Sequence, residues 1–248
     1  MRRQENNSPQ VSIITINLNN GNELENTLLS VHNQTYKNFE YIIIDGGSSD
    51  NSLNVITTNS DKITLYISEP DNGIYDAMNK GIRMAKGSWL LFLNAGDLLC
   101  DNLVLENIFS RLVIKDYDIL YGGVKLKCKD DYEIVMPSEL CSFFYKMPFC
   151  HQSSFVKNDI LKEKEFNQNY KIAADYDFFC QMYRERKKFK KINLCVSVFA
   201  DGGVSSINKK QMYDEFKTIS NTWFNGFFRK KMYICYKYFV LLRKLKIK

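Results

Sequence analysis

The stretch GIYDAMNKGIRMAKGSWLLFLNAGD, residues 73–97, predicts a helix that leads into a buried strand. Gly87 is suited to the C′ position that ends the helix, and Trp89–Leu93 is an unbroken apolar run of strand length. The run stops at the polar loop 94–97, whose Asp97 needs a partner because it follows a buried strand. The helix is predicted because small and apolar residues recur on one face: Ile74, Ala77, Met78, Gly81, Ile82 and Ala85.

Units of the same kind precede this stretch. Residues 23–33 predict a helix with Leu24 and Leu28 on its apolar face and Asn22 as its N-cap. Strands that alternate with helices at this spacing indicate an α/β fold with a mostly parallel, doubly wound sheet flanked by helices. Apolar runs typical of buried parallel strands lie at residues 11–16, 41–44 and 63–67.

The second half of the chain is less regular. Residues 118–121 predict a strand, 176–186 predict a helix, and 148–152 predict a loop. The chain has 248 residues, of which 45% are hydrophobic, which is enough for one α/β domain with a small extension. The seven cysteines show no C-x-x-C spacing, so we expect reduced thiols rather than disulfides or a zinc site.

Charge divides the chain into a body and a tail. The net charge is +6, and the nine Lys and Arg residues after Glu215 meet no acidic residue, so 1–215 carries −3. We expect a polar segment at 1–10 with no apolar signal region, a body over 11–215, and a basic, aromatic, helical extension over 216–248. No window is apolar over the roughly 18 residues that a spanning helix requires.

Polar loops follow each predicted strand of the first half. The carboxyl ends of parallel strands share one edge of the sheet, where ligands bind in folds of this class. The sequence has no G-x-G-x-x-G or P-loop motif, which disfavours an ordinary dinucleotide or ATPase site. Alternatively, Asp45-Gly-Gly is only a tight turn and Asp97 only a helix cap. The loops span residues 15–20, 45–50, 69–73 and 94–97.

Taken together, these segments resemble the family 2 glycosyltransferases of the GT-A (Rossmann-like) fold. Such enzymes move a sugar from a nucleotide-sugar to an acceptor hydroxyl with inversion at the anomeric carbon. The resemblance implies a nucleotide-sugar half at about 11–124 and an acceptor and catalytic half at about 125–215. It runs in order through VSIITINLNN, YIIIDGGSSDNS, SEPDNGIYDAMNKGI, GSWLLFLNAGDLL, FCHQSSF, YKIAADYDFF and FADGGVS.

The resemblance implies that Asp97 holds Mn²⁺ or Mg²⁺ against the donor diphosphate. The family carries an Asp-x-Asp motif in this loop, here reduced to Asn94-Ala-Gly-Asp97, so Asn94 is the weaker oxygen donor. Hard divalent cations prefer oxygen ligands, often one or two carboxylates together with phosphate oxygens.

The resemblance also implies a set of residues that bind the nucleotide-sugar, which we expect to be a UDP-sugar. Asp45 matches the position that reads the base, although the Asp usual after it is Gly46 here. Lys80 takes the place of a cation usually found before Asn79, and an Asp76–Lys80 surface pair is the alternative. The expected donor-binding residues are Thr15, Asn17, Asp45, Asp71, Asp76, Asn79, Lys80 and Asn94.

Inverting transfer needs a base that takes the proton of the acceptor hydroxyl. In the family this is the Asp of a Glu-Asp pair, which matches Asp175 here, with Asp177 as support; the structural alternative for Asp177 is a helix cap. The resemblance places His151 and Gln152 near the acceptor. Gly202 and Gly203 match a flexible loop that closes over the substrates.

The tail interleaves cations with large aromatic residues, which suits a helix in the interface of an anionic membrane. The alternative is a helix packed on the body, and the acidic body disfavours a nucleic-acid arm. We therefore expect a cytoplasmic protein, peripheral on the inner face of the cell membrane. It would elongate a lipid-linked glycan for a surface polysaccharide of the O-antigen, lipopolysaccharide or capsule kind.

Two other functions remain open at this point. A sugar-phosphate nucleotidyltransferase uses a similar sheet but carries a Gly-rich, basic first loop, which TINLNNGNE lacks. A catalytically degenerate, membrane-bound sugar-binding module is the non-enzymatic alternative, and the presence of Asp97 and Asp175 disfavours it.

Overall fold

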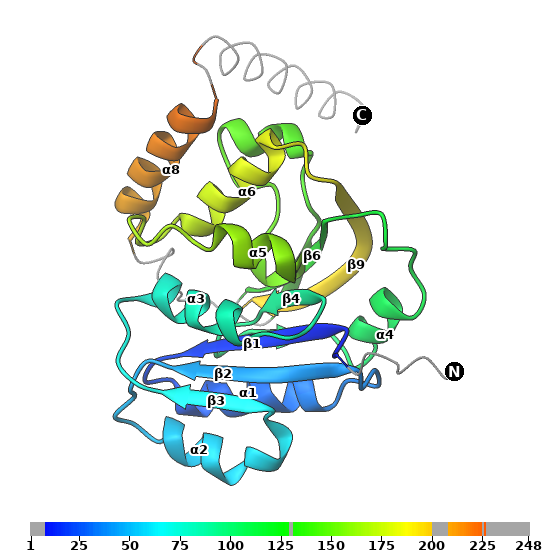
Figure 1. Ribbon diagram of the computed structural model, residues 1–248, viewed down its shortest axis with the longest axis vertical. Helices are drawn as coiled ribbons and strands as arrows, with labels where there is room; N and C mark the ends of the chain where they lie inside the picture. Colours follow the sequence, from blue (N-terminus) through cyan, green and yellow to red (C-terminus); the bar gives the residue numbers. More distant parts are fainter. Residues whose placement is uncertain (1–7, 129–130, 200–207, 225, 227–248) are drawn as a thin grey trace, which may run out of the picture.

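A computed structural model describes residues 8–128, 131–199, 208–224 and 226. One sheet runs through this part of the chain in the order β3-β2-β1-β4-β8-β6-β9-β5, and β7 pairs with β6 (Figure 1). The strands are β1 (Val11–Asn17), β2 (Phe39–Asp45), β3 (Leu65–Ser68), β4 (Trp89–Phe92), β5 (Leu98–Leu99), β6 (Ile119–Cys128), β7 (Asp131–Val135), β8 (Ser154–Lys157) and β9 (Phe189–Phe199).

The first four strands of the sheet are parallel, as the sequence predicts. β1 and β2 pair from Val11↔Phe39 to Asn17↔Asp45, so the two strands end in the same row. Both strands are buried almost throughout, which explains their continuous apolar sequences. Beyond β4 the sheet becomes mixed, because β8 pairs antiparallel with both β4 and β6.

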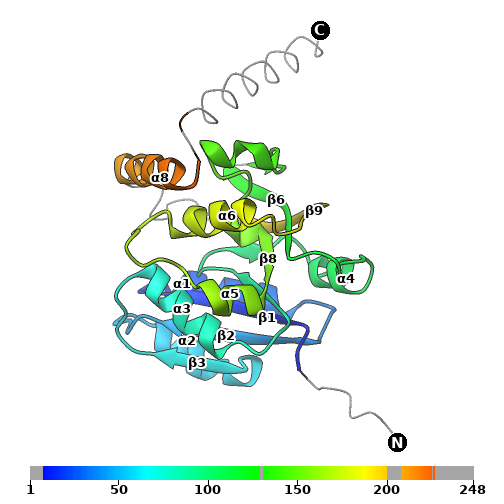
Figure 2. The same cartoon turned by 45° about the horizontal axis from the view of Figure 1, so that its top comes forward.

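Helices cover both faces of the sheet (Figures 1 and 2). The alternation of side chains along each strand divides the core in two. Ile14 and Ile42 face the cluster that includes α3 and α6, whereas Ile13 and Ile43 face the cluster that includes α1. The helices are α1 (Gly21–His32), α2 (Ser52–Thr58), α3 (Ile74–Met84), α4 (Val104–Phe109), α5 (Asn158–Lys164), α6 (Ala174–Arg184) and α8 (Lys209–Trp223), with short 3₁₀ turns η1 (Ser60–Lys62), η2 (Leu140–Phe144) and η3 (His151–Ser153).

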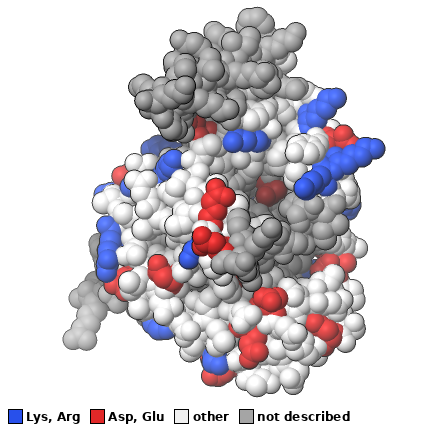
Figure 3. Space-filling model, turned by 180° about the vertical axis from the view of Figure 1, so that it is seen from behind, with Lys and Arg blue, Asp and Glu red and all other residues white. Residues whose placement is uncertain are grey.

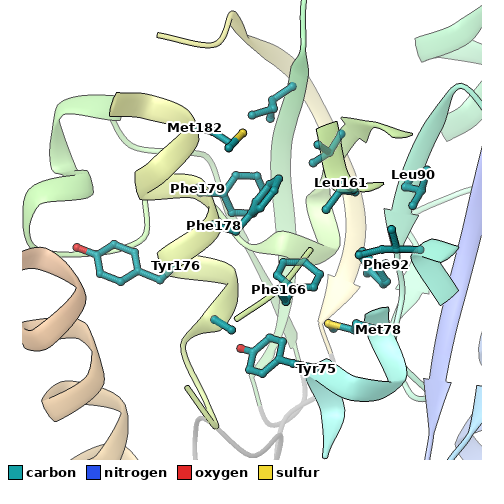
Figure 4. Packing of buried hydrophobic residues seen from close by; sticks show 14 of the residues in the cluster. Tyr75, Met78, Leu90, Phe92, Leu161, Phe166, Tyr176, Phe178, Phe179 and Met182 are labelled. Atoms are coloured by element: carbon teal, nitrogen blue, oxygen red, sulfur yellow. The ribbon is translucent and has the colours of Figure 1, made fainter. Parts of the chain in front are cut away.

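Aromatic side chains fill the space between α3 and α6. Figure 4 shows Tyr75 and Phe166 between these helices, with Phe178 of α6 beside them. The ring centroids of Tyr75 and Phe166 lie 5.6 Å apart, and those of Phe166 and Phe178 lie 5.5 Å apart. Contacts of this kind fix α6 relative to the sheet edge at which α3 begins.

Two predicted helix ends are wrong. The residue before α1 is Asn20 rather than Asn22, and its side chain makes no capping bond but donates to Ala95 O. α3 ends at Met84, so Gly87 is not its C′ residue. A Cβ on Gly87 would lie 2.5 Å from Ser12 N, so this glycine is required for a close approach to β1.

The predicted domain boundaries do not match breaks in the fold. α8 runs without interruption across residues 215 and 216, and β6 runs across 124 and 125. Ile219 and Phe224 are buried in the same core cluster as α6, so the body continues to at least Phe224. The rest of the expected tail, apart from exposed Gly226, lies outside the described residues. Within the described chain, no helix combines the length and the hydropathy needed to cross a bilayer.

Candidate active site

A row of polar side chains crosses the carboxyl ends of β1, β2 and β3. Asn17 pairs in register with Asp45, and Asp45 pairs with Ser68. The Asp45 carboxylate accepts hydrogen bonds from Asn17 Nδ2 at 2.7 Å, Ser68 Oγ at 2.7 Å and Ser48 N at 3.0 Å. The Ser48 hydroxyl donates as well, at 2.5 Å. Asp45 therefore joins the ends of three strands.

This arrangement changes the role expected for Asp45. Burial raises the pKa of its carboxyl, but the hydrogen bonds from Ser48, Ser68 and Asn17 outweigh that effect, and the net pKa is lowered. The side chain has 0% of its surface exposed. A carboxylate with four protein donors and no exposed surface organises the strand ends, so a direct contact with a base is not supported.

Thr15 and Asn17 are also buried. The Thr15 hydroxyl donates to Leu93 O at 2.7 Å and accepts from the Tyr41 hydroxyl, so it links β1 to β4 rather than facing a ligand. Asn17 differs, because its Oδ1 is buried and has no hydrogen-bond partner among the described residues. Such an atom calls for a ligand or an ordered water.

The loop after β4 continues the hydrogen bonding of the sheet. Ala95 N donates to Ile16 O, and Asp97 N closes a turn onto Asn94 O at 2.9 Å. Gly96 has a φ of 102°, a conformation that favours glycine, and its N–H donates to Thr27 of α1. Asp97 is 3% exposed, and Asn94 Oδ1 is buried with no hydrogen-bond partner in the part of the chain described.

These loop residues suit a hard divalent cation. Asn94 Oδ1 and the Asp97 carboxylate are oxygen donors separated by one turn of loop, which is the donor chemistry that Mn²⁺ and Mg²⁺ take. Across the described ranges, no group of three or more His, Cys, Asp or Glu side chains gathers as a metal site. A cation here would therefore need ligands from substrate or water as well.

The Asp71 carboxylate lies against Gly46, the position at which an Asp is usual in the resemblance described above. A Cβ on Gly46 would come within 2.5 Å of Asp71 Oδ2 and 3.3 Å of Leu18 Cδ1. Asp71 also accepts from Gly73 N at 2.8 Å, just before α3. The Leu18 side chain is 57% exposed, so an apolar surface and a carboxylate stand side by side at this edge.

The predicted residues of α3 fall into two groups. Lys80 Nζ contacts Glu69 Oε1 at 2.8 Å and Asp76 at 3.9 Å, and Asp76 Oδ2 accepts from Asn72 N. The expected Asp76–Lys80 pair exists, but Glu69 is the nearer partner. Asn79 is 1% exposed, and both its polar groups bond the Phe166 backbone, at 2.9 and 2.8 Å. It anchors the segment after α5, so we remove it from the candidate donor site.

A second group gathers at the start of α6. Asp175 Oδ2 lies 3.1 Å from His151 Nδ1, and Asp175 Oδ1 lies 3.1 Å from the Tyr75 hydroxyl. The side chains of Asp175 and His151 are 17% and 16% exposed. The structure therefore brings together two predicted residues, Asp175 and His151, and adds Tyr75, which the sequence did not single out.

Asp177 belongs to a different contact. Its Oδ1 accepts from Trp223 Nε1 at 2.7 Å, which links α6 to α8. Burial raises the pKa of Asp177, and the hydrogen bonds from Trp223 and Asn167 oppose that shift. Its partner makes it a packing contact between helices, and the expected supporting role in catalysis is not supported.

Tyr75 links the donor loops to the Asp175–His151 pair, because it lies in the first turn of α3 and contacts Asp175. Burial raises the pKa of Cys150 to about 11, and the charges of Asp175 and Asp97 add to the shift. Gln152 is buried in the same turn, η3. Gly202 and Gly203 lie outside the described residues. The described cysteines Cys100, Cys141, Cys150, Cys180 and Cys195 are free thiols.

Glu215 of α8 is a second residue that the sequence did not indicate. Its carboxylate accepts from the backbone N–H groups of Lys171, Ile172 and Ala173 at 2.9–3.0 Å, just before α6. Burial raises the pKa of Glu215, but these bonds outweigh it and lower the net value. No local motif predicts such a contact, because donors and acceptor are more than 40 residues apart.

A hollow of about 420 Å³ opens elsewhere, between α8 and the segment before α6. Its lining includes Tyr170, Gln211 and Glu215, and none of the predicted donor residues, so we do not place the nucleotide there. On the face shown in Figure 3, acidic side chains are prominent over the lower half, in keeping with the net charge of −3 for residues 1–215.

The family model and the relatives that match this chain point to the same family. The family model described as Glycosyl transferase family 2 matches residues 12–192. A PGL/p-HBAD biosynthesis glycosyltransferase of Mycobacterium bovis is 32% identical over 176 residues, which cover 69% of this chain and 68% of the relative.

Solved structures share the fold at low identity. A fragment of S. aureus TarS in complex with UDP-GlcNAc has a TM-score of 0.69 and 15% identity, covering 86% of this chain and 66% of that one. The chain spans only 39% of a longer TarS structure. Glucosyl-3-phosphoglycerate synthase of Mycobacterium tuberculosis, crystallised with Mn²⁺ and UDP, has a TM-score of 0.62 and 10% identity, covering 86% and 80%. The fold is therefore the GT-A fold.

Proposed function

The chain belongs to glycosyl transferase family 2, and we propose that it transfers a sugar from a UDP-sugar to a hydroxyl of a glycan acceptor with inversion. One observation carries the proposal: the Asp175–His151 pair lies next to the donor loops, because Tyr75, in the first turn of α3 directly after the loop at residues 69–73, lies 3.1 Å from Asp175. Inverting transfer needs a site that binds the nucleotide-sugar and a group that accepts the proton of the acceptor hydroxyl. UDP or UDP-GlcNAc in the related structures supports the choice of donor.

The donor would bind along the ends of β1, β3 and β4. Asn17 Oδ1 is a buried acceptor without a partner among the described residues, so a hydroxyl group of the ribose or the sugar would complete it. Exposed Leu18 offers an apolar surface for the base, beside the Asp71 carboxylate. Lys80, already paired with Glu69, adds a cation near these groups.

Asp97 and Asn94 would hold the divalent cation implied by the family, Mn²⁺ or Mg²⁺. When bound, such a cation neutralises charge on the departing nucleoside diphosphate. Related structures contain Mn²⁺ together with a donor or with UDP, which supports this choice.

The Asp175–His151 pair would act on the acceptor. In an inverting reaction, the acceptor oxygen attacks the anomeric carbon on the side opposite the diphosphate, and its proton must leave as the new bond forms. Asp177 accepts a hydrogen bond from Trp223 and is therefore engaged in packing. Among the described residues at the start of α6, this leaves the Asp175–His151 pair to act as the base. The bonding electrons of the broken C–O bond leave with the nucleoside diphosphate.

We propose a lipid-linked glycan as the acceptor, in the synthesis of a surface polysaccharide, with the protein on the inner face of the membrane. The sequence of residues 227–248 supports this placement. It carries eight Lys and Arg residues, six aromatic residues and no acidic residue. Such a composition suits anionic lipid surfaces.

The experiment is a donor panel. Purified protein is incubated with UDP-glucose, UDP-galactose, UDP-GlcNAc and GDP-mannose in the presence of Mn²⁺, and released nucleotide is assayed. We expect release from at least one UDP-sugar and calorimetric binding of UDP. Failure to bind any of these nucleotides would overturn the proposal, and release from GDP-mannose alone would overturn the choice of UDP.

A further inference from the structure

His151 uses one ring nitrogen and leaves the other without a partner. Nδ1 lies 3.1 Å from Asp175 Oδ2. Nε2 is buried and has no hydrogen-bond partner in the described chain. A buried polar atom left in this state costs about 1–3 kcal/mol. The cost is offset if a ligand completes the hydrogen bond when it binds.

Asp175 is held so that it fixes the form of the imidazole. Its Oδ1 accepts from Tyr176 N at 2.9 Å and lies 3.1 Å from the Tyr75 hydroxyl. Burial, together with the nearby charge of Asp175, raises the pKa of Tyr75 well above its ordinary value, so Tyr75 keeps its proton and remains a donor. With Oδ1 engaged, Oδ2 faces His151 and favours the tautomer that carries its proton on Nδ1.

The backbone around His151 is also fixed. His151 O accepts from the Ser154 hydroxyl at 2.8 Å, and Cys150 O accepts from Ser153 N at 3.0 Å. η3 leads directly into β8, which pairs with β4, the strand that ends at the Asp97 loop. The residue is thus held at its backbone and at Nδ1, and Nε2 is the ring nitrogen that has no hydrogen-bond partner in the described chain.

We propose that His151 Nε2 is the atom that takes the proton from the acceptor hydroxyl, with Asp175 as the residue that orients and stabilises the imidazole. The proposal rests on the proposed function. In the step, the O–H bond of the acceptor breaks as its oxygen bonds the anomeric carbon. The proton moves to Nε2, and the nucleoside diphosphate leaves with the electron pair of the broken bond. The resulting imidazolium is then stabilised by the Asp175 carboxylate through Nδ1–H.

A merely supporting His151 makes a different prediction. If it served only to hold Asp175, any side chain that donates a hydrogen bond from the same position would replace it. Asparagine is such a side chain, because its amide N–H can take the place of Nδ1–H and it has no counterpart of Nε2. His151→Asn therefore separates the two roles of the ring.

The test compares His151→Asn with the wild type. The substrate is whichever of UDP-glucose, UDP-galactose and UDP-GlcNAc the enzyme hydrolyses fastest, with water as the acceptor. We expect the kcat of His151→Asn to fall by about 10²–10⁴, the range of a lost general base. The Kd for UDP, from calorimetry, should stay within about threefold of wild type, because His151 lies outside the donor loops.

The pH dependence of kcat/KM provides the second readout. We expect the acidic limb of the wild-type profile to disappear in His151→Asn, because the titrating base is removed. Asp175 is the titratable group that contacts the ring, Tyr75 contacts the same carboxylate, and Cys150 is the residue before His151. A variant with near-normal kcat, or an acidic limb that stays in place, assigns the proton to Asp175 and overturns the proposal. A wild-type protein that binds no UDP would instead contradict the proposed function.

Discussion

At the scale of single residues, the carboxylates of the site differ in the contacts that hold them. Asp45 and Asp177 are committed, the first to Ser48, Ser68 and Asn17, the second to Trp223. Asp97 lies one turn of loop from Asn94, whose Oδ1 has no partner among the described residues. Substitutions at Asp97 should therefore affect the proposed cation site, whereas those at Asp45 and Asp177 should affect stability.

Replacing Asp97 should abolish transfer with little effect on the fold. Asp97→Ala removes the charged ligand proposed for the cation, while the residue lies past the end of β4 rather than inside it. We expect loss of Mn²⁺-dependent nucleotide release and a circular dichroism spectrum like that of the wild type. Asp61→Ala, an exposed carboxylate in η1, is the matched control. Near-normal turnover of Asp97→Ala with chelator present would show that the assignment is wrong.

The two carboxylates of α6, Asp175 and Asp177, should respond differently to the same substitution. Asp175→Asn should lower transfer by about 10²–10⁴, because it disturbs the base. Asp177→Asn should instead lower the free energy of unfolding, because it weakens the bond from Trp223 Nε1. Steady-state kinetics and urea unfolding on both variants check this. A greater loss of activity in Asp177→Asn would mean that Asp177 is the catalytic carboxylate.

Asp45 should make stability depend on pH. Its pKa in the folded protein is below the ordinary value of 3.8, so its contribution is present above that value and is lost as pH falls through the folded pKa. Asp45→Asn should cost about 2 kcal/mol at neutral pH, and the difference from wild type should shrink as the pH falls below the ordinary value of 3.8. Urea unfolding across this range measures it. A difference that does not change with pH would contradict the effect.

At the scale of helices and strands, α8 is part of the catalytic architecture. Glu215 accepts three backbone N–H groups from the segment that enters α6, and Ala173, at the N-cap position of α6, makes no side-chain cap. Backbone N–H groups that leave water need acceptors. α8 supplies one from a distant part of the chain to the segment that ends two residues before Asp175.

Glu215→Gln should therefore weaken both stability and catalysis. The amide keeps one acceptor oxygen but turns an NH₂ group toward backbone donors, so we expect a loss of about 2 kcal/mol in unfolding free energy. Transfer should fall as well, because the start of α6 positions Asp175. Asp214→Asn, on the neighbouring exposed residue, is the control. Equal stability of the two variants would show that the contact is unimportant.

The elements differ in how far the sequence could predict them. β1, β2 and α3 follow from burial and periodicity, which are local properties of the chain. The role predicted for Gly87 is wrong, because a Cβ at this position would clash with Ser12, a residue far away in the sequence. The same limit applies at the site. A strand-end carboxylate such as Asp45 looks like a ligand until the serines of two other segments are seen around it.

At the scale of the whole molecule, the described body ends later than its charge pattern suggests. Trp223 and Phe224 contact the core, and removal after Thr222 would break the bond to Asp177. The extension that remains for membrane binding is residues 227–248, which the sequence describes but the structure does not.

Truncation after Gly226 should abolish binding to anionic vesicles and leave donor hydrolysis intact. Eight cations at about 1 kcal/mol each near an anionic surface are ample for attachment. Flotation with phosphatidylserine-containing and with neutral liposomes measures it, for the full chain and the truncated one. Equal recovery of both proteins with anionic liposomes would mean that residues 227–248 do not anchor the protein.

The bond between Glu215 and the segment before α6 also sets an order of events during synthesis. A ribosome makes the donor loops first, then Asp175, and Glu215 only roughly 2–8 s later at 5–20 residues per second. During that interval the growing chain holds the strands for nucleotide binding, but the segment that leads into α6 lacks its acceptor. We expect the nascent protein to recognise its donor before it can consume it, so that activity begins only when its last described helix has left the ribosome.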